Sequence, residues 1–84
     1  MAPKRDKRLE AMRANPRGDW RIADIKAVCR EHGLRCEPPG GGGSHFKIAH
    51  PRLADMLSIP FARPIKSVYI RKLIAMIAAV DALE

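Results

Sequence analysis

The clearest strand signal in the chain lies in residues 43–50, which read Gly-Ser-His-Phe-Lys-Ile-Ala-His. Phe46 and Ile48 alternate here with His45 and Lys47, and a period of two is that of a β-strand with one buried face. If Phe46 and Ile48 point into a core, His45 and Lys47 stand on the open face of a sheet. A run of four glycines ends where this stretch begins and predicts a loop. An imidazole and a positive charge exposed on one face beside a loop suit chemistry on an anion.

Two shorter segments on either side of this stretch complete the predicted sheet. Residues 34–37 alternate as a short strand, which ends where two prolines and the glycine run follow. Residues 55–60 are predicted to form the third strand. When the apolar residues of these strands share one core face, Lys47 lies opposite Ser58, because a slip of one residue would bury Lys47.

Three segments are predicted to be helical. The first covers residues 3–14 and ends before Pro16, because a residue that precedes proline avoids the helical conformation. The second begins after Asp19 as its N-cap, and Gly33 supplies the left-handed residue that ends it. The third is predicted from an apolar stripe at helical spacing, which comprises Val68, Ile70, Leu73, Ile74, Ile77 and Val80.

The order of these elements predicts an α+β fold. A first helix precedes a second helix, three antiparallel strands and a last helix, and the two later helices are expected to cover one face of the sheet. We divide the chain into a basic N-terminal helical extension, residues 1–18, and a domain over residues 19–84. The open face of the sheet is predicted to carry Arg35, His45, Lys47 and Ser58.

The composition is strongly basic, which bears on the class of partner. Sixteen Lys and Arg residues against nine Asp and Glu residues give a formal net charge of +7. A domain this basic usually meets the phosphates of RNA or DNA, or an acidic protein. The basic residues are dense in residues 1–21. A basic surface that only keeps the protein in solution is the alternative explanation for any one of them.

Several function classes lack support in the sequence. No apolar run has the length of a signal peptide core or a membrane span, so we expect a cytoplasmic protein without a membrane partner. Cys29, Cys36 and the three histidines lack the spacing of zinc ligands, and no metal or other cofactor is predicted. The glycine run is not followed by the Lys-Ser or Lys-Thr pair of a nucleotide-binding loop.

Three short motifs occur at the ends of these predicted strands and helices. They are residues 43–46, Gly-Ser-His-Phe, where the central strand begins; residues 59–60, Ile-Pro, where the third strand ends; and residues 64–71, Pro-Ile-Lys-Ser-Val-Tyr-Ile-Arg, where the last helix begins. Together they resemble the HicA family of bacterial toxins, small RNA-cleaving proteins of type II toxin–antitoxin pairs. The resemblance covers about residues 20–80.

This resemblance carries expectations about fold, activity and partner. It implies a double-stranded-RNA-binding-like αβββα fold, metal-independent cleavage of mRNA, and a hetero-oligomer with a HicB-like antitoxin. The functional histidine of the family corresponds to His45. Shorter members often carry a second histidine just after the proline that ends the third strand. Residues 61–63 of this chain, Phe-Ala-Arg, contain none, which leaves His45 without a histidine partner.

His45 is therefore the candidate catalytic residue. An imidazole changes its charge near neutral pH, so it can take the proton of a 2′-hydroxyl or donate one to the leaving oxygen. One histidine cannot do both at once, and water or another side chain must do the rest. Lys47 on the same face would stabilise the negative charge of the transition state, although an ordinary exposed strand lysine explains it equally well.

A wider set of residues is predicted to contact RNA. Ser44 would donate a hydrogen bond to a phosphate, although turn chemistry also explains a serine there. The complete predicted set is Ser44, Lys47, Arg35 and Ser58 on the sheet, with Lys4, Arg5, Lys7 and Arg8 on the N-terminal helix. The alternative function is a non-catalytic double-stranded-RNA-binding module of similar fold, in which His45 is only a contact. A pure protein-interaction domain accounts less well for the net charge.

Overall fold

The described part of the chain folds into three helices and a three-stranded antiparallel sheet. The computed structural model describes residues 4–40 and 43–83, and side chains from residue 7 onward. The elements in chain order are α1 (Lys4–Ala14), α2 (Ile22–Glu31), β1 (Arg35–Glu37), β2 (His45–Ala49), β3 (Leu57–Pro60) and α3 (Ser67–Ala82). This order confirms the predicted α+β class and the additional N-terminal helix.

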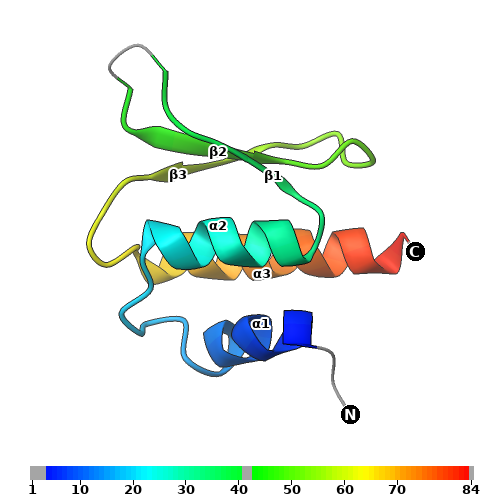
Figure 1. Ribbon diagram of the computed structural model, residues 1–84, viewed down its shortest axis with the longest axis horizontal. Helices are drawn as coiled ribbons and strands as arrows, with labels where there is room; N and C mark the ends of the chain where they lie inside the picture. The colour runs from blue at the N-terminus through cyan, green and yellow to red at the C-terminus, as the bar shows by residue number, and fades with distance from the viewer. Residues whose placement is uncertain (1–3, 41–42, 84) are drawn as a thin grey trace.

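The elements form three layers, which Figure 1 shows edge-on. The sheet is one layer, and α2 and α3 lie on the same side of it, with α2 in contact with β1 and α3 in contact with β3. The helix α1 packs against α2 and α3 on the side away from the sheet. The opposite face of the sheet is not covered by any described element, as the sequence predicts. None of the helices in the described part of the chain has the length and apolar character needed to cross a bilayer.

The sheet has β2 at its centre, between β1 and β3. The pairing places Lys47 opposite Ser58 and Ile48 opposite Leu57, which confirms the predicted register. Phe46 and Ile48 are buried against the helices, while His45 and Lys47 are exposed. The hydrophobic pattern is thus sufficient to fix the register of a central strand that is buried on one face.

The turn between α2 and β1 has the geometry predicted from Gly33. This glycine adopts a left-handed conformation with a φ of 75°. The Leu34 N–H donates to the Cys29 carbonyl at 2.8 Å, the six-residue closure that ends a helix in a Schellman motif. The strand consequently begins at Arg35, one residue later than predicted.

The start of α2 differs from the prediction that Asp19 is its N-cap. The N-cap is Arg21, whose N–H donates to the Asp24 carboxylate at 2.9 Å. Asp19 instead accepts hydrogen bonds from the Arg21 guanidinium. The reason lies in Trp20, whose carbonyl accepts the Ile65 N–H at 2.7 Å and is therefore committed to a non-helical contact.

A single aliphatic core holds the layers together. Its buried side chains are Leu9, Met12, Ile25, Val28, Cys29, Leu34, Ile48, Ile59, Ile65, Ile70, Leu73, Ile77 and Val80. Leu9 and Met12 come from α1, so the N-terminal helix shares the core of the rest of the chain. Val68, predicted to lie in the α3 stripe, is 47% exposed, because it precedes Ile70 by two residues and so points to the other side of the helix.

Candidate functional site

A hollow of about 450 Å³ lies at one end of the sheet, where β1 and β2 lead into the glycine-rich loop, and polar side chains as well as prolines and glycines line it. We call it the His45 hollow, and the residues that line it are Glu37, Pro38, Pro39, Gly40, Gly43, Ser44, His45 and Lys47. The Gly43 N–H donates to the Gly40 carbonyl at 3.0 Å. The other two glycines of the run lie outside the described residues.

His45 begins β2, and the backbone around it is anchored on both sides. It pairs with Pro60 across the sheet, and the Phe61 N–H donates to the carbonyl of the preceding Ser44 at 2.7 Å. The imidazole itself is exposed, and its Nδ1 lies 3.4 Å from the Ser44 hydroxyl oxygen. A fixed backbone with an accessible ring is the arrangement that an acid–base group needs.

Lys47 stands in a row of exposed side chains that crosses the open face. Its strand partners are Glu37 on β1 and Ser58 on β3. The alternation of β2 puts Lys47 on the same face as His45, two residues along the strand. The structure therefore brings an ammonium group, an imidazole and the Ser44 hydroxyl to one hollow, as the sequence predicts.

Arg35 and Ser58 share the open face but do not line the His45 hollow. Arg35 pairs with Ala49 towards the other end of β2, and its guanidinium Nη1 lies 3.5 Å from a Glu37 carboxylate oxygen. Ser58 is exposed on β3. Their predicted contacts with RNA therefore require a strand of RNA that extends beyond the hollow across the sheet.

The basic residues of α1 lie on a different side of the molecule. Lys7 is exposed and Arg8 donates to the Glu31 carboxylate of α2 at 2.6 Å. Both line a separate hollow with Trp20, and the α2–α3 layer stands between α1 and the sheet. The side chains of Lys4 and Arg5 lie outside the described residues. The structure thus does not bring Lys7 or Arg8 together with His45.

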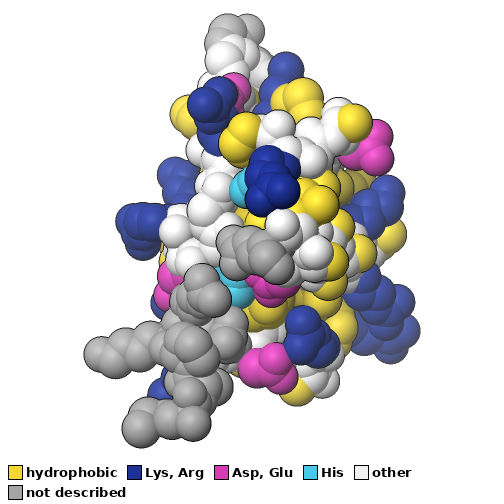
Figure 2. Space-filling view, turned by 90° about the vertical axis from the view of Figure 1, so that its right-hand side faces the viewer, with side chains coloured by type: hydrophobic (Ala, Val, Ile, Leu, Met, Phe, Trp, Pro, Cys, Tyr) yellow, Lys and Arg dark blue, Asp and Glu magenta, His cyan; other side chains and the backbone are white. Residues whose placement is uncertain are grey.

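Basic side chains are scattered over the face of the molecule that Figure 2 shows. In this view, from the right-hand side of Figure 1, Lys and Arg stand near the middle as well as at the edges, and acidic side chains lie among them. The net charge of +7 therefore acts as a broad attraction for anions. The net charge alone does not determine where on the surface a bound anion could react. That position depends on local groups such as those of the His45 hollow.

Glu37 is the functional candidate that the sequence analysis missed. It is exposed at the end of β1 and is the one carboxylate among the described residues that line the His45 hollow. The signal that identifies it is the β1–β2 register, which places Glu37 opposite Lys47. That register depends on how the chain turns through the glycine run, which the sequence pattern alone does not define.

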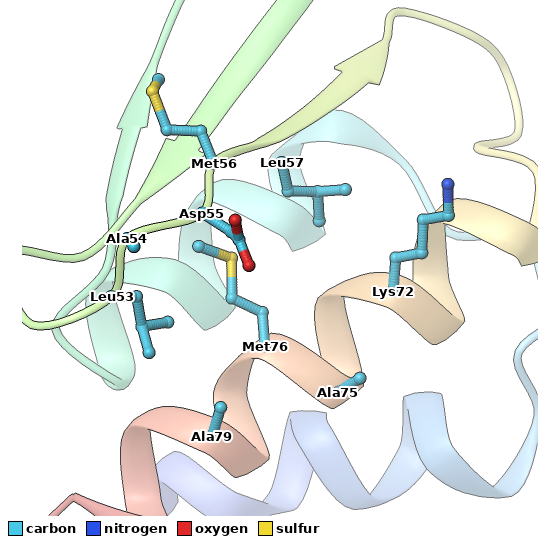
Figure 3. Close-up of a pocket in the computed structure, with 9 residues that line it drawn as sticks. All are labelled: Leu53, Ala54, Asp55, Met56, Leu57, Lys72, Ala75, Met76 and Ala79. Atoms are coloured by element: carbon cyan, nitrogen blue, oxygen red, sulfur yellow. The ribbon is translucent and has the colours of Figure 1, made fainter.

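A second hollow, between the β2–β3 connection and α3, is chemically different. Figure 3 shows that it is lined by Met56, Met76 and other apolar side chains, with Asp55 and Lys72 as its charged groups. Among the described residues that line it there is no histidine, cysteine, serine or tyrosine. Asp55 is therefore a carboxylate that lies outside the His45 hollow.

The two cysteines are free thiols held in the fold. Cys29 is buried, and this burial, with a contribution from Cys36 beside it, raises the pKa of the Cys29 thiol to about 12. Burial also raises the pKa of Cys36. Protonated thiols are poor nucleophiles and poor metal ligands. Within residues 4–40 and 43–83, no three His, Cys, Asp or Glu side chains are placed together as a metal site.

Comparison of the chain with protein-family models, with curated proteins and with solved structures found no match. A functional assignment therefore depends on the side chains themselves. An imidazole, an ammonium, a hydroxyl and a carboxylate around one open hollow in a basic protein can bind a phosphodiester and move protons at it.

Proposed function

We propose that this chain is the toxin component of a type II toxin–antitoxin system, a metal-independent endoribonuclease that cleaves mRNA with His45 as its catalytic residue. The observation that carries the proposal is the exposed His45 imidazole in a hollow it shares with Lys47 and Ser44. The resemblance of the sequence motifs to the HicA family supports the same assignment.

Each group in the hollow has a defined task in this reaction. The His45 imidazole transfers a proton, a contribution typically worth about 10²–10⁴-fold in rate. The Lys47 ammonium stabilises the negative charge that develops on the phosphoryl oxygens. The Ser44 hydroxyl donates a hydrogen bond to the phosphate or to the His45 ring, 3.4 Å away.

A non-catalytic RNA-binding module is the second candidate function. It is favoured by the absence of a second histidine after Pro60, where the chain continues with Phe61. The two functions separate when purified protein is incubated with mRNA in EDTA. A ribonuclease shortens the RNA with multiple turnovers, whereas a binding module shifts its electrophoretic mobility and leaves its length unchanged. Intact RNA in a stable complex would refute the catalytic proposal.

RNA binding is expected to depend on salt through the phosphate contacts of the open sheet face. Each phosphate contact contributes about 0.7–0.9 to the slope of log K against log salt. Lys47→Gln should therefore reduce the slope by about that amount. Lys7→Gln should leave it unchanged, because α1 lies beyond the helix layer. If both substitutions lower the slope equally, the RNA also contacts α1.

Control of such a nuclease is expected to come from an acidic HicB-like antitoxin that covers the open face. Opposite charges speed the association, and burial of His45 blocks proton transfer. Diethyl pyrocarbonate should modify His45 quickly in the free protein and at least about ten-fold more slowly in the complex, with His50 as the internal reference. An inhibited complex in which His45 reacts as fast as before would place the control elsewhere.

A further inference from the structure

We infer that Glu37 is the second catalytic residue of this site, the general base that activates the 2′-hydroxyl, and that His45 is the general acid. The inference rests on the proposed ribonuclease function and assigns the proton transfer that a single histidine cannot perform. Its basis is the placement of a carboxylate and an imidazole on the lining of one hollow, with a lysine between them.

The sheet register sets the separation of the two groups. Glu37 lies directly opposite Lys47, and His45 is two residues along β2 on the same face. Glu37 and His45 are therefore diagonal cross-strand neighbours, a relation in which Cα atoms lie about 7–8 Å apart. This separation leaves room for a phosphate between the two side chains. If Glu37 and His45 were hydrogen-bonded to each other, a phosphate could not enter between them.

The carboxylate of Glu37 is available to a ligand. Both Glu37 and Arg35 are exposed, and the contact between the Arg35 Nη1 and the Glu37 Oε1 is long, at 3.5 Å. An exposed ion pair of this kind contributes little to stability. It can reorient when RNA enters, and Arg35 then offers its charge to the neighbouring phosphate.

These groups account for every proton transfer in the cleavage reaction, and no further reactant is needed. The Glu37 carboxylate takes the proton from the 2′-hydroxyl, and the 2′-oxygen forms a bond to phosphorus. The bond from phosphorus to the 5′-oxygen breaks, and the His45 imidazolium gives its proton to that oxygen. Lys47 stabilises the charge on the phosphoryl oxygens throughout. The products are a 2′,3′-cyclic phosphate and a 5′-hydroxyl.

A carboxylate in this position is unfavourable for a site that only binds RNA. It repels phosphate and reduces the attraction of Lys47 opposite. A merely electrostatic role for Glu37 therefore predicts that its neutralisation tightens binding and speeds catalysis at low RNA concentration. A catalytic role predicts a loss of turnover, and the two roles are separated by kcat and KM.

The first experiment compares Glu37→Gln with Asp55→Asn, which removes the same charge at the second hollow. In EDTA, kcat of Glu37→Gln should fall about 10²–10⁴-fold with KM equal or lower, while Asp55→Asn keeps the wild-type kcat. Glu37→Asp, which keeps a carboxylate, should retain part of the activity.

The second experiment assigns the two proton transfers. An RNA in which the 5′-oxygen at the cleavage site is replaced by sulfur has a leaving group that needs no general acid. His45→Ala should cleave this substrate at nearly the wild-type rate, whereas Glu37→Gln should remain slow. Rescue of Glu37→Gln instead of His45→Ala would reverse the assignment and overturn it.

The outcomes distinguish this inference from the proposed function. If wild-type protein does not cleave RNA, both fail. If wild type cleaves, His45→Ala does not, and Glu37→Gln cleaves as fast as Asp55→Asn, the ribonuclease stands and the role of Glu37 is refuted. The unfolding temperatures of Glu37→Gln and Asp55→Asn should match that of wild type, because both carboxylates are exposed. A loss of activity caused by unfolding would instead appear as a lower unfolding temperature.

Discussion

Replacing His45 with alanine is expected to lower the rate of RNA cleavage by about 10²–10⁴-fold or more and to abolish growth inhibition on expression. The fold should remain intact, because the ring is exposed and its removal takes no packing from the core. Cleavage of a labelled RNA in EDTA gives the rate, and thermal unfolding of the same preparation gives the stability.

His50→Ala is the matched control for this substitution. His50 follows the same strand, but its Nδ1 accepts the Arg52 N–H at 3.0 Å and it does not line the His45 hollow. This variant should cleave RNA at the wild-type rate. Equal cleavage by His45→Ala and wild type would rule out the proposed mechanism, and an unfolded His45→Ala protein would show that His45 is structural.

Removal of α1 is expected to have the largest effect on stability. Leu9 and Met12 are buried in the common core, and truncation of one buried Met or Leu to alanine costs about 2–5 kcal/mol. Because a domain of this size has a total stability of about 5–15 kcal/mol, deletion of residues 1–15 should leave the chain largely unfolded. Such a deletion cannot test RNA binding by α1, whereas Lys7→Gln can.

The single substitution Met12→Ala tests the docking of α1 by urea unfolding. It should lower the free energy of unfolding by about 2–5 kcal/mol. Met56→Ala is the control, since Met56 is 61% exposed and its truncation should change stability by no more than about 0.5 kcal/mol. Equal stability of the two variants would show that α1 is not packed on α2 and α3 in solution.

Periodicity in the sequence predicted the parts of the fold that depend on burial. The alternation of Phe46 and Ile48 with His45 and Lys47 identified the central strand, its register with β3 and its open face. Gly33 identified the end of α2, because only glycine adopts the left-handed conformation there without strain. These local rules agree with the tertiary structure, so the sequence was sufficient.

Tertiary contacts overrode the local rules elsewhere. Asp19 is a good N-cap by type, but the hydrogen bond from Ile65 to the Trp20 carbonyl delays the start of α2. The packing of α1 away from the sheet separates Lys7 and Arg8 from the His45 hollow, and no pattern within α1 reveals which layer it joins. The sequence pattern does not predict that Glu37 lies beside Lys47, because the pairing of β1 with β2 determines this position.

Analysis of the ends that cleavage leaves on RNA is the sharpest test of catalysis in the His45 hollow. Wild-type protein in EDTA should produce fragments with 2′,3′-cyclic phosphate and 5′-hydroxyl ends, and a 2′-O-methyl group at the cleavage site should stop the reaction. Fragments with 3′-hydroxyl and 5′-phosphate ends, or cleavage that begins only when Mg²⁺ is added, would contradict it.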